Sequence, residues 1–221
     1  MSKTTSRTRV LAEVAIFAAL SAGLYAIRPF SLPYGGSITA GSMIPIFWLS
    51  LRRGIKVGMF AGAIFGAVAL PIDVLLLPYS PIANPVQVFV EYPLAFGVLG
   101  LAGLFRNPPS AVRDIHAQID EMKKKLKSEA ENLTQLSRRV AVLENEILSV
   151  RALAGAGIGI IVRFFMHFLA GIVFWYFTVP EGWNVVAWSA VYNGSFLIGE
   201  FVISAFLIYL LVRKGTLKMF M

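Results

Sequence analysis

An apolar, helix-length stretch of the chain contains three side chains that are suited to binding a small molecule. The stretch RFFMHFLAGIVFW begins at Arg163, ends at Trp175 and includes His167. Arg163 and His167 are four residues apart, so on a helix they share one face, and Gly171 leaves room beside that face. Trp175 would follow His167 by about 12 Å along the axis, roughly the length of a small vitamin. One interpretation is a binding site; the other is an ordinary membrane helix whose His bonds a neighbouring helix.

A second set of polar side chains lies in the apolar segment at 85–104. Asn84, Gln87 and Glu91 are spaced by three and four residues, which places them on one helix face. A carboxylate about six residues inside a lipid-spanning helix is costly unless it faces a cavity or a partner. We therefore predict a functional role for Glu91.

The last apolar segment, 185–212, has its own polar residues. Ser189 and Asn193 lie one turn apart, and Glu200 lies deeper in the segment. Hydrogen bonds between helices are a common use of such residues in membrane bundles, and ligand binding is the alternative. Glu200 could form an ion pair with Arg163 or contact a ligand, and the sequence leaves both open.

The composition is that of a polytopic membrane protein. The 221 residues are 57% hydrophobic and only 14% charged, against about 25% charged in soluble domains. We predict an all-α fold with six transmembrane helices, at about 10–27, 43–51, 57–77, 85–104, 152–179 and 185–212. The net charge of +8 comes from basic residues between these segments, where they set membrane orientation, so nucleic acid is not an expected partner.

The first apolar segment is rich in alanine. Ala15, Ala19 and Ala22 belong to overlapping small-xxx-small spacings, which let another helix approach closely. They predict either a docking surface for a partner or packing within the protein's own bundle.

The connections and breaks between the next segments also follow from composition. Residues 28–42 are rich in Pro, Gly and Ser, so we expect a loop with turns that is long enough to act as a lid. We expect Pro71 and Asp73 to break the third segment.

Residues 108–151 have a different pattern. Apolar residues follow one another in alternating steps of four and three, which is the heptad repeat of a coiled coil; they are Ile115, Ile119, Met122, Leu126, Leu133, Leu136, Val140, Leu143, Ile147 and Val150. Glu129 is the polar exception. No Gly or Pro occurs between Ser110 and Ala154, so a single helix of about 60 Å is expected, with self-association as one use of its apolar seam.

The charges predict an orientation. With six helices both termini lie on one side, together with the basic loops near 52–56 and 106–151, while Asp73 and Glu181 fall on the other side. The termini and the coiled-coil insertion are therefore predicted to be cytoplasmic. The domain division is 1–107 and 152–221 as one membrane domain, interrupted by the insertion 108–151.

Several kinds of chemistry are excluded or disfavoured. The chain has no P-loop motif, so it cannot hydrolyse nucleotide by that route. It has no cysteine, and its two histidines, His116 and His167, lie in different regions, which disfavours a zinc site. No nucleophile has an obvious base. We expect neither an enzyme nor a cofactor.

Several of these stretches together resemble one family. In chain order they are the alanine-rich first segment, GSITAGSMIPIFWLSLRRGIKVG, NPVQVFVEYPLAF, RFFMHFLAGIVFW and AWSAVYNGSFLIGE. They resemble the thiamine-specific substrate-binding (S) component of energy-coupling factor (ECF) transporters, over all six helices but not 108–151. The resemblance implies a six-helix bundle that binds thiamine near the outer face of the membrane and docks on a coupling subunit with two ATPase subunits.

The resemblance also implies a set of site residues. They are Glu91, Tyr92, His167, Trp175 and Asn193 from the family pattern, and Trp188, Phe65 and Tyr34 at positions where this chain departs from it. The family usually has a tyrosine where Trp188 stands and a tryptophan where Phe65 stands, and Tyr34 is the aromatic residue nearest to its lid tryptophan.

The chemistry of thiamine fits such a site. A buried carboxylate compensates the cationic thiazolium, aromatic faces bind the rings, and amides fix the orientation. The function expected is capture of thiamine for uptake, without chemistry. An S component for another vitamin or a thiamine precursor is an alternative, as is a membrane-anchored coiled-coil scaffold.

Overall fold

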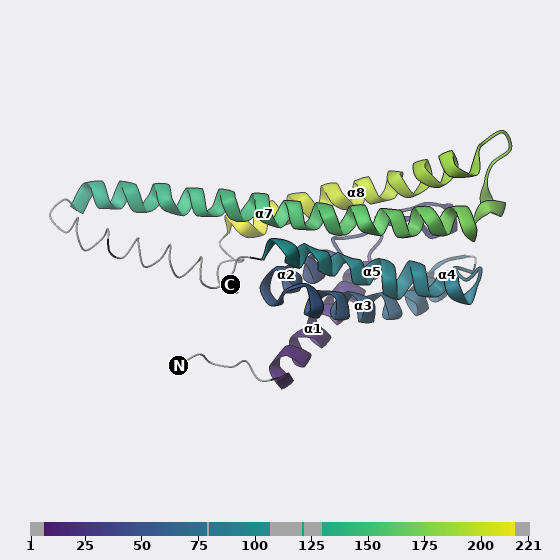
Figure 1. The fold of residues 1–221 in the computed structure, drawn as a ribbon, viewed down its shortest axis with the longest axis horizontal. Helices are drawn as coiled ribbons and strands as arrows, with labels where there is room; N and C mark the ends of the chain where they lie inside the picture. Colours follow the sequence, from purple (N-terminus) through teal and green to yellow (C-terminus); the bar gives the residue numbers. More distant parts are fainter. Residues whose placement is uncertain (1–6, 79, 107–120, 122–129, 215–221) are drawn as a thin grey trace.

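A computed structural model describes residues 7–78, 80–106, 121 and 130–214 and shows a bundle of helices (Figure 1). The long helices are α1 (Arg7–Ala26), α3 (Ile55–Leu76), α7 (Ala130–Val173) and α8 (Val185–Arg213). A further helical run consists of α4 (Pro85–Phe89), the π-helical turn η2 (Val90–Leu94), α5 (Ala95–Gly97) and η3 (Val98–Phe105). The short elements are α2 (Ile44–Arg53), η1 (Pro33–Gly35) and η4 (Tyr176–Thr178), with the strands β1 (Phe30–Ser31) and β2 (Ser37–Ile38).

Five helical segments are long and apolar enough to cross a membrane, among the residues that the structure describes. They are 7–26, 55–76, 85–105, 148–173 and 185–213. The sixth span expected at 43–51 is α2, which has ten residues and reaches about 15 Å, half of a hydrocarbon core. The chain before it, expected to be a loop with turns, forms an antiparallel hairpin in which Phe30 pairs with Ile38. The multi-pass helical fold is thus confirmed, whereas six full spans are not.

The prediction of a break in the third segment is wrong. α3 continues through Pro71 and Asp73 to Leu76. Its glycines instead allow close contact with the next helical run: a Cβ on Gly62 would lie 2.3 Å from the carbonyl oxygen of Phe96, and one on Gly66 would lie 2.2 Å from that of Tyr92. The backbone that bears Tyr92 is therefore held directly against α3.

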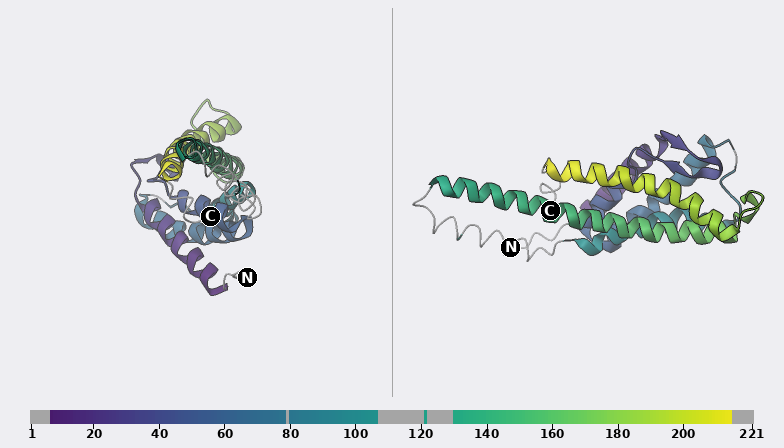
Figure 2. Two further views of the ribbon diagram at one scale, coloured as in Figure 1. Left: turned by 90° about the vertical axis from the view of Figure 1, so that its left-hand side faces the viewer. Right: turned by 90° about the horizontal axis from the view of Figure 1, so that it is seen from above.

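α7 and α8 lie side by side and antiparallel, joined by the turn at 174–184, while α1 leans away from them (Figure 2). α7 has 44 residues, a length of about 66 Å, and it crosses the boundary at Arg151 that we predicted between insertion and membrane domain. Its N-terminal part extends beyond the bundle (Figure 1). Most of the predicted coiled-coil seam lies outside the described residues or side chains; Val150, a member of the seam, is 66% exposed.

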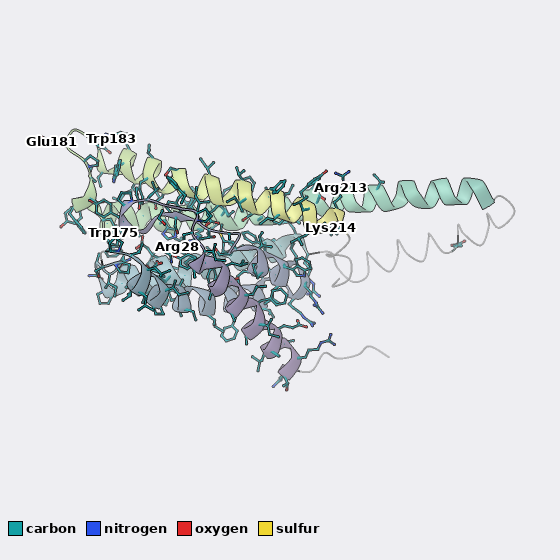
Figure 3. All side chains as sticks on the ribbon, turned by 180° about the vertical axis from the view of Figure 1, so that it is seen from behind. Arg28, Trp175, Glu181, Trp183, Arg213 and Lys214 are labelled. Atoms are coloured by element: carbon teal, nitrogen blue, oxygen red, sulfur yellow. The ribbon has the colours of Figure 1, made fainter. Side chains whose placement is uncertain are left out.

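The two ends of the bundle differ in charge. Arg213 and Lys214 lie at one end, where α7 extends outward, and Glu181 and Trp183 lie at the opposite end (Figure 3). Trp175 lies toward the Glu181 end. Asp73 was expected on the same side of the membrane as Glu181. It is instead 3% exposed and lies inside the bundle rather than in a loop.

Candidate functional site

A cavity lies between the β hairpin, the π-helical turn and the pair α7–α8. Its lining combines carboxylates, an arginine, amide and hydroxyl groups and many aromatic rings: Tyr25, Tyr34, Gly35, Gly36, Ser37, Asp73, Pro81, Glu91, Tyr92, Phe96, Arg163, His167, Gly171, Trp175, Thr178, Trp188, Ser189, Tyr192, Asn193 and Phe196. Seven of the eight predicted ligand-binding residues line it. The exception is Phe65, which is fully buried behind the cavity and packs edge-on against Tyr25 and Phe96, with ring centroids 5.6 and 4.5 Å away.

Glu91 is the centre of a hydrogen-bond network in this cavity. The indole Nε1 of Trp175 donates to Glu91 Oε2 at 2.9 Å, and Nδ1 of His167 lies 3.4 Å from Oε1. Gln87 Nε2 also donates to Oε2. Within the described residues no lysine or arginine nitrogen lies within 4.0 Å of this carboxylate, so its charge has no fixed cationic partner.

Trp175 reaches Glu91 because the helix ends before it. α7 stops at Val173, and Trp175 has non-helical dihedrals (φ −111°, ψ 15°). The expected axial distance of about 12 Å between His167 and Trp175 assumed a continuing helix. Instead both residues contact the two oxygens of one carboxylate, so they form one cluster at the end of α7.

The helical turn that bears Glu91 and Tyr92 is itself irregular. It is a π-helical turn, Val90–Leu94, that contains Pro93. Proline lacks the N–H that an α-helical ladder needs, and single π turns occur frequently at functional sites. The wider turn places Glu91 and Tyr92, which are adjacent in sequence, both at the cavity.

Asp73 is a second carboxylate at the cavity, more deeply buried than Glu91, and sequence reasoning did not assign it to the site. Its Oδ2 accepts hydrogen bonds from Tyr92 Oη at 2.7 Å and Tyr25 Oη at 3.0 Å. Arg28 Nη2 forms a salt bridge with Oδ1, and both side chains are almost fully buried, at 6% and 4% exposure. An available signal was the occurrence of an arginine and an aspartate in otherwise apolar surroundings, where each ion needs a partner.

A hydrogen bond from Arg163 fixes the tautomer of His167. Its Nε donates to His167 Nε2 at 3.3 Å, so that nitrogen is an acceptor and the proton of a neutral ring lies on Nδ1, facing Glu91. Arg163 also donates to Met43 Sδ at 3.0 Å, and its Cζ lies 4.0 Å from the ring centre of Phe96. No salt bridge joins it to Glu200 in the described part of the chain. Glu200 instead accepts the backbone N–H of Thr39 at 2.7 Å.

The polar residues of α8 make interhelical hydrogen bonds beside the cavity. Ser189 Oγ donates to the carbonyl of Phe168 at 2.8 Å, and Asn193 Nδ2 donates to the carbonyl of His167 at 3.3 Å. A Cβ on Gly171 would lie 2.2 Å from Ser189 Oγ, so the glycine permits this close packing. Both residues also line the cavity, and the packing role therefore does not remove them from a binding site.

The hairpin is attached to α8 over the cavity. Tyr192 Oη accepts the N–H of Gly36 at 2.9 Å and donates to the carbonyl of Pro33. Between these residues, Tyr34 has a left-handed backbone (φ 68°), an uncommon conformation for a residue with a side chain. Trp188 lies in a row with Tyr192, its ring centre 5.9 Å away. Tyr192 was not among the predicted site residues.

The alanines of α1 do not share one environment. Ala15 and Ala19 are exposed on the outside of the bundle, whereas Ala22 is 8% exposed and belongs to the hydrophobic core. The outer face of α1 is thus available for helix contact at Ala15 and Ala19 but not at Ala22, because Ala22 packs inside the bundle.

Comparisons with known proteins identify the family. The sequence model of the Thiamine transporter protein family (Thia_YuaJ) matches residues 11–220. The chain belongs to the thiamine transporter family. It is 31% identical to the thiamine transporter ThiT of Bacillus subtilis (strain 168), over 91% of this chain and 88% of that protein.

Two further relatives agree with this membership in the thiamine transporter family. The thiamine transporter ThiT of Lacticaseibacillus paracasei is also 31% identical, over 84% of this chain and 77% of that protein. The solved structure of ThiT from Listeria monocytogenes superimposes with a TM-score of 0.71 at 25% identity, covering 96% of this chain and 98% of that one. The family is one of transporters rather than enzymes.

Proposed function

We propose that this protein binds thiamine in the cavity between the hairpin and α7–α8, with Glu91 offsetting the positive charge of the thiazolium. The observation that carries the proposal is a largely buried carboxylate, 13% exposed, that neutral donors hold in place and that no arginine or lysine of the described chain pairs. A buried charge without a partner is costly, so a cationic ligand that supplies the missing charge gains affinity.

The remaining lining suits the two rings of thiamine. Trp175, Trp188 and His167 offer aromatic faces for a cation and for a pyrimidine. The side-chain oxygen of Asn193 has no hydrogen-bond partner among the described residues, whereas its nitrogen is occupied by Ser189 and His167. That oxygen is suited to accept from the exocyclic amino group.

The same proposal extends to the transport cycle. The cavity lies toward the end of Glu181, away from the basic end, so we place it at the outer face and place both termini and the insertion 108–151 in the cytoplasm. The chain has no P-loop, so it does not hydrolyse nucleotide by that route. From the family resemblance we propose that separate ATPase subunits and a coupling subunit of the ECF type energise uptake, with the exposed side of α1 at Ala15 and Ala19 as the docking surface. Self-association is one use of the coiled-coil seam.

A titration of the purified protein with thiamine, followed by tryptophan fluorescence, tests the proposal. We expect saturable quenching, because Trp175 and Trp188 line the cavity. Parallel titrations with a thiamine precursor and with uncharged vitamins distinguish the alternative ligands. Absence of binding by the folded wild-type protein contradicts thiamine as the ligand and favours the scaffold alternative.

A further inference from the structure

Gln87 is a fully buried polar residue that contacts the cavity residue Glu91 without lining the cavity itself. It is 0% exposed and lies one turn before Glu91 in the same helical run. On its other side lies the loop at 80–84, which precedes α4 at the Glu181 end of the molecule. Gln87 therefore connects that loop to Glu91, the carboxylate that is proposed to bind the ligand.

Both side-chain amide hydrogens of Gln87 are donated in hydrogen bonds. Its Nε2 donates to the carbonyl of Pro81 at 3.3 Å and to Glu91 Oε2. Its Oε1 faces the backbone N–H groups of Ala83, at 3.1 Å, and Asn84, at 3.5 Å. Because the loop supplies two donors on one side and an acceptor on the other, the amide has one orientation, with a nitrogen toward Glu91.

The other two donors to Glu91 come from across the cavity. His167 belongs to α7 and Trp175 to the turn after it, so both can change their contacts when a ligand enters between them. Gln87 lies one turn before Glu91 in the same helical run and is held from behind by hydrogen bonds to the loop. It is thus suited to fix the carboxylate relative to its own helix whatever lies in the cavity.

We propose that Gln87 is a positioning residue for ligand binding, which holds the Glu91 carboxylate in the orientation that a cationic ligand requires. The inference rests on the proposed binding of a thiamine-like cation at Glu91. It assigns to Gln87 no contact with the ligand. Its effect on affinity is exerted through Glu91, and therefore depends on the ligand's charge.

A double-mutant cycle tests this role, with thiamine and a neutral isostere that lacks the ring charge as ligands. Gln87→Met keeps the size and removes the amide. We expect about tenfold weaker thiamine binding, as for loss of one hydrogen bond to a charged group. The neutral isostere should lose much less. In a Glu91→Gln background the same substitution should have about threefold effect or less, because coupled residues are not additive.

Asn84→Ala is the matched control. Asn84 and Gln87 form one capping box at the start of α4, in which the Asn84 side chain accepts the N–H of Val86. Asn84→Ala weakens the cap but leaves Glu91 untouched, so thiamine affinity should remain that of the wild type while the melting temperature falls.

Glu91→Asp supplies a second test that does not depend on how well Gln87→Met folds. It keeps the charge but withdraws the carboxylate by one methylene from Gln87 and from the ligand, and we expect thiamine affinity to fall at least tenfold if the position of the charge matters; the double-mutant cycle assigns that position to Gln87. Unchanged thiamine affinity in either variant, or equal losses for the two ligands in Gln87→Met, overturns the positioning role. Failure of the wild type to bind thiamine would instead overturn the proposed function.

Discussion

Two carboxylates line the same cavity, the buried Asp73 and the partly buried Glu91, and their charges are balanced differently. Asp73 has a cation, Arg28, in a salt bridge and accepts two tyrosine hydroxyls. Glu91 is contacted by an indole N–H, an imidazole and an amide, none of which is a fixed cation. The comparison teaches that burial alone does not mark a ligand group. A carboxylate whose charge is already balanced stabilises the fold, and one whose charge is unbalanced is available to a cation from outside.

The largest expected effect is on stability, at Asp73. Asp73→Asn leaves the Arg28 guanidinium buried without its counter-charge, which typically costs about 3 to 5 kcal/mol. We expect a marked fall in the melting temperature of the purified protein. Replacing both partners, as Arg28→Met with Asp73→Leu, should recover much of the loss because no charge then remains buried. If the single substitution left the melting temperature unchanged but abolished thiamine binding, the roles of the two carboxylates would have to be exchanged.

The next effect is on affinity, at Glu91. Glu91→Gln keeps the shape and most hydrogen bonds but deletes the charge, so thiamine should bind about 1.5 to 3 kcal/mol more weakly, a loss of tenfold or more. Titrations of wild type and variant with thiamine and with a neutral isostere measure the difference. Equal losses for both ligands would mean that Glu91 acts only as a hydrogen-bond acceptor, as Asp73 does toward its tyrosines.

A smaller effect is expected at Trp175, which donates to Glu91 and offers a ring to the ligand. Trp175→Ala should weaken thiamine binding by about 1 to 2 kcal/mol, the value of a desolvated cation–π contact. It should also remove most of the fluorescence quenching. A titration curve identical to that of the wild type would exclude Trp175 from the site.

The smallest effect is expected for the insertion, which touches neither carboxylate in the described structure. Replacing 110–150 by a short flexible linker should leave thiamine affinity unaltered, since the cavity lies at the opposite end of the bundle. Equilibrium titration of the shortened protein measures this. If the shortened protein still melted cooperatively but no longer bound thiamine, the insertion would influence the binding site even without a partner protein.

Much of the site could be predicted because polar groups in apolar segments are costly and therefore few. Glu91 was singled out for that reason and a binding role for His167 was one of two interpretations, whereas Asn193 and the aromatic residues came from the family resemblance. Asp73 was misplaced because Pro71 suggested a helix end, whereas α3 continues past both residues. Pro71 does not end α3, which is packed along its length against the helical run that bears Tyr92 and Phe96.

Other features depend on three-dimensional packing that spacing does not specify. Small residues recur on both faces of α1, so the sequence did not show that Ala22 faces inward while Ala15 and Ala19 face outward. The π-helical turn at Val90–Leu94 and the early end of α7 at Val173 decide where Tyr92 and Trp175 point. Both depart from a regular α-helix, and the early end of α7 is the reason why the estimate of about 12 Å between His167 and Trp175 does not apply.

The continuity of α7 has a mechanical consequence. One helix without an interruption joins Ala130, far outside the bundle, to His167 at the cavity, a distance of about 56 Å at the helical rise. A continuous helix transmits a tilt of one end to the other, apart from the gentle curvature that long helices adopt. If the outer part of α7 is cytoplasmic and thiamine binds at the cavity, as we propose, a protein that tilted that part of α7 would displace Arg163 and His167 relative to Glu91 and so change the binding site from the other side of the membrane.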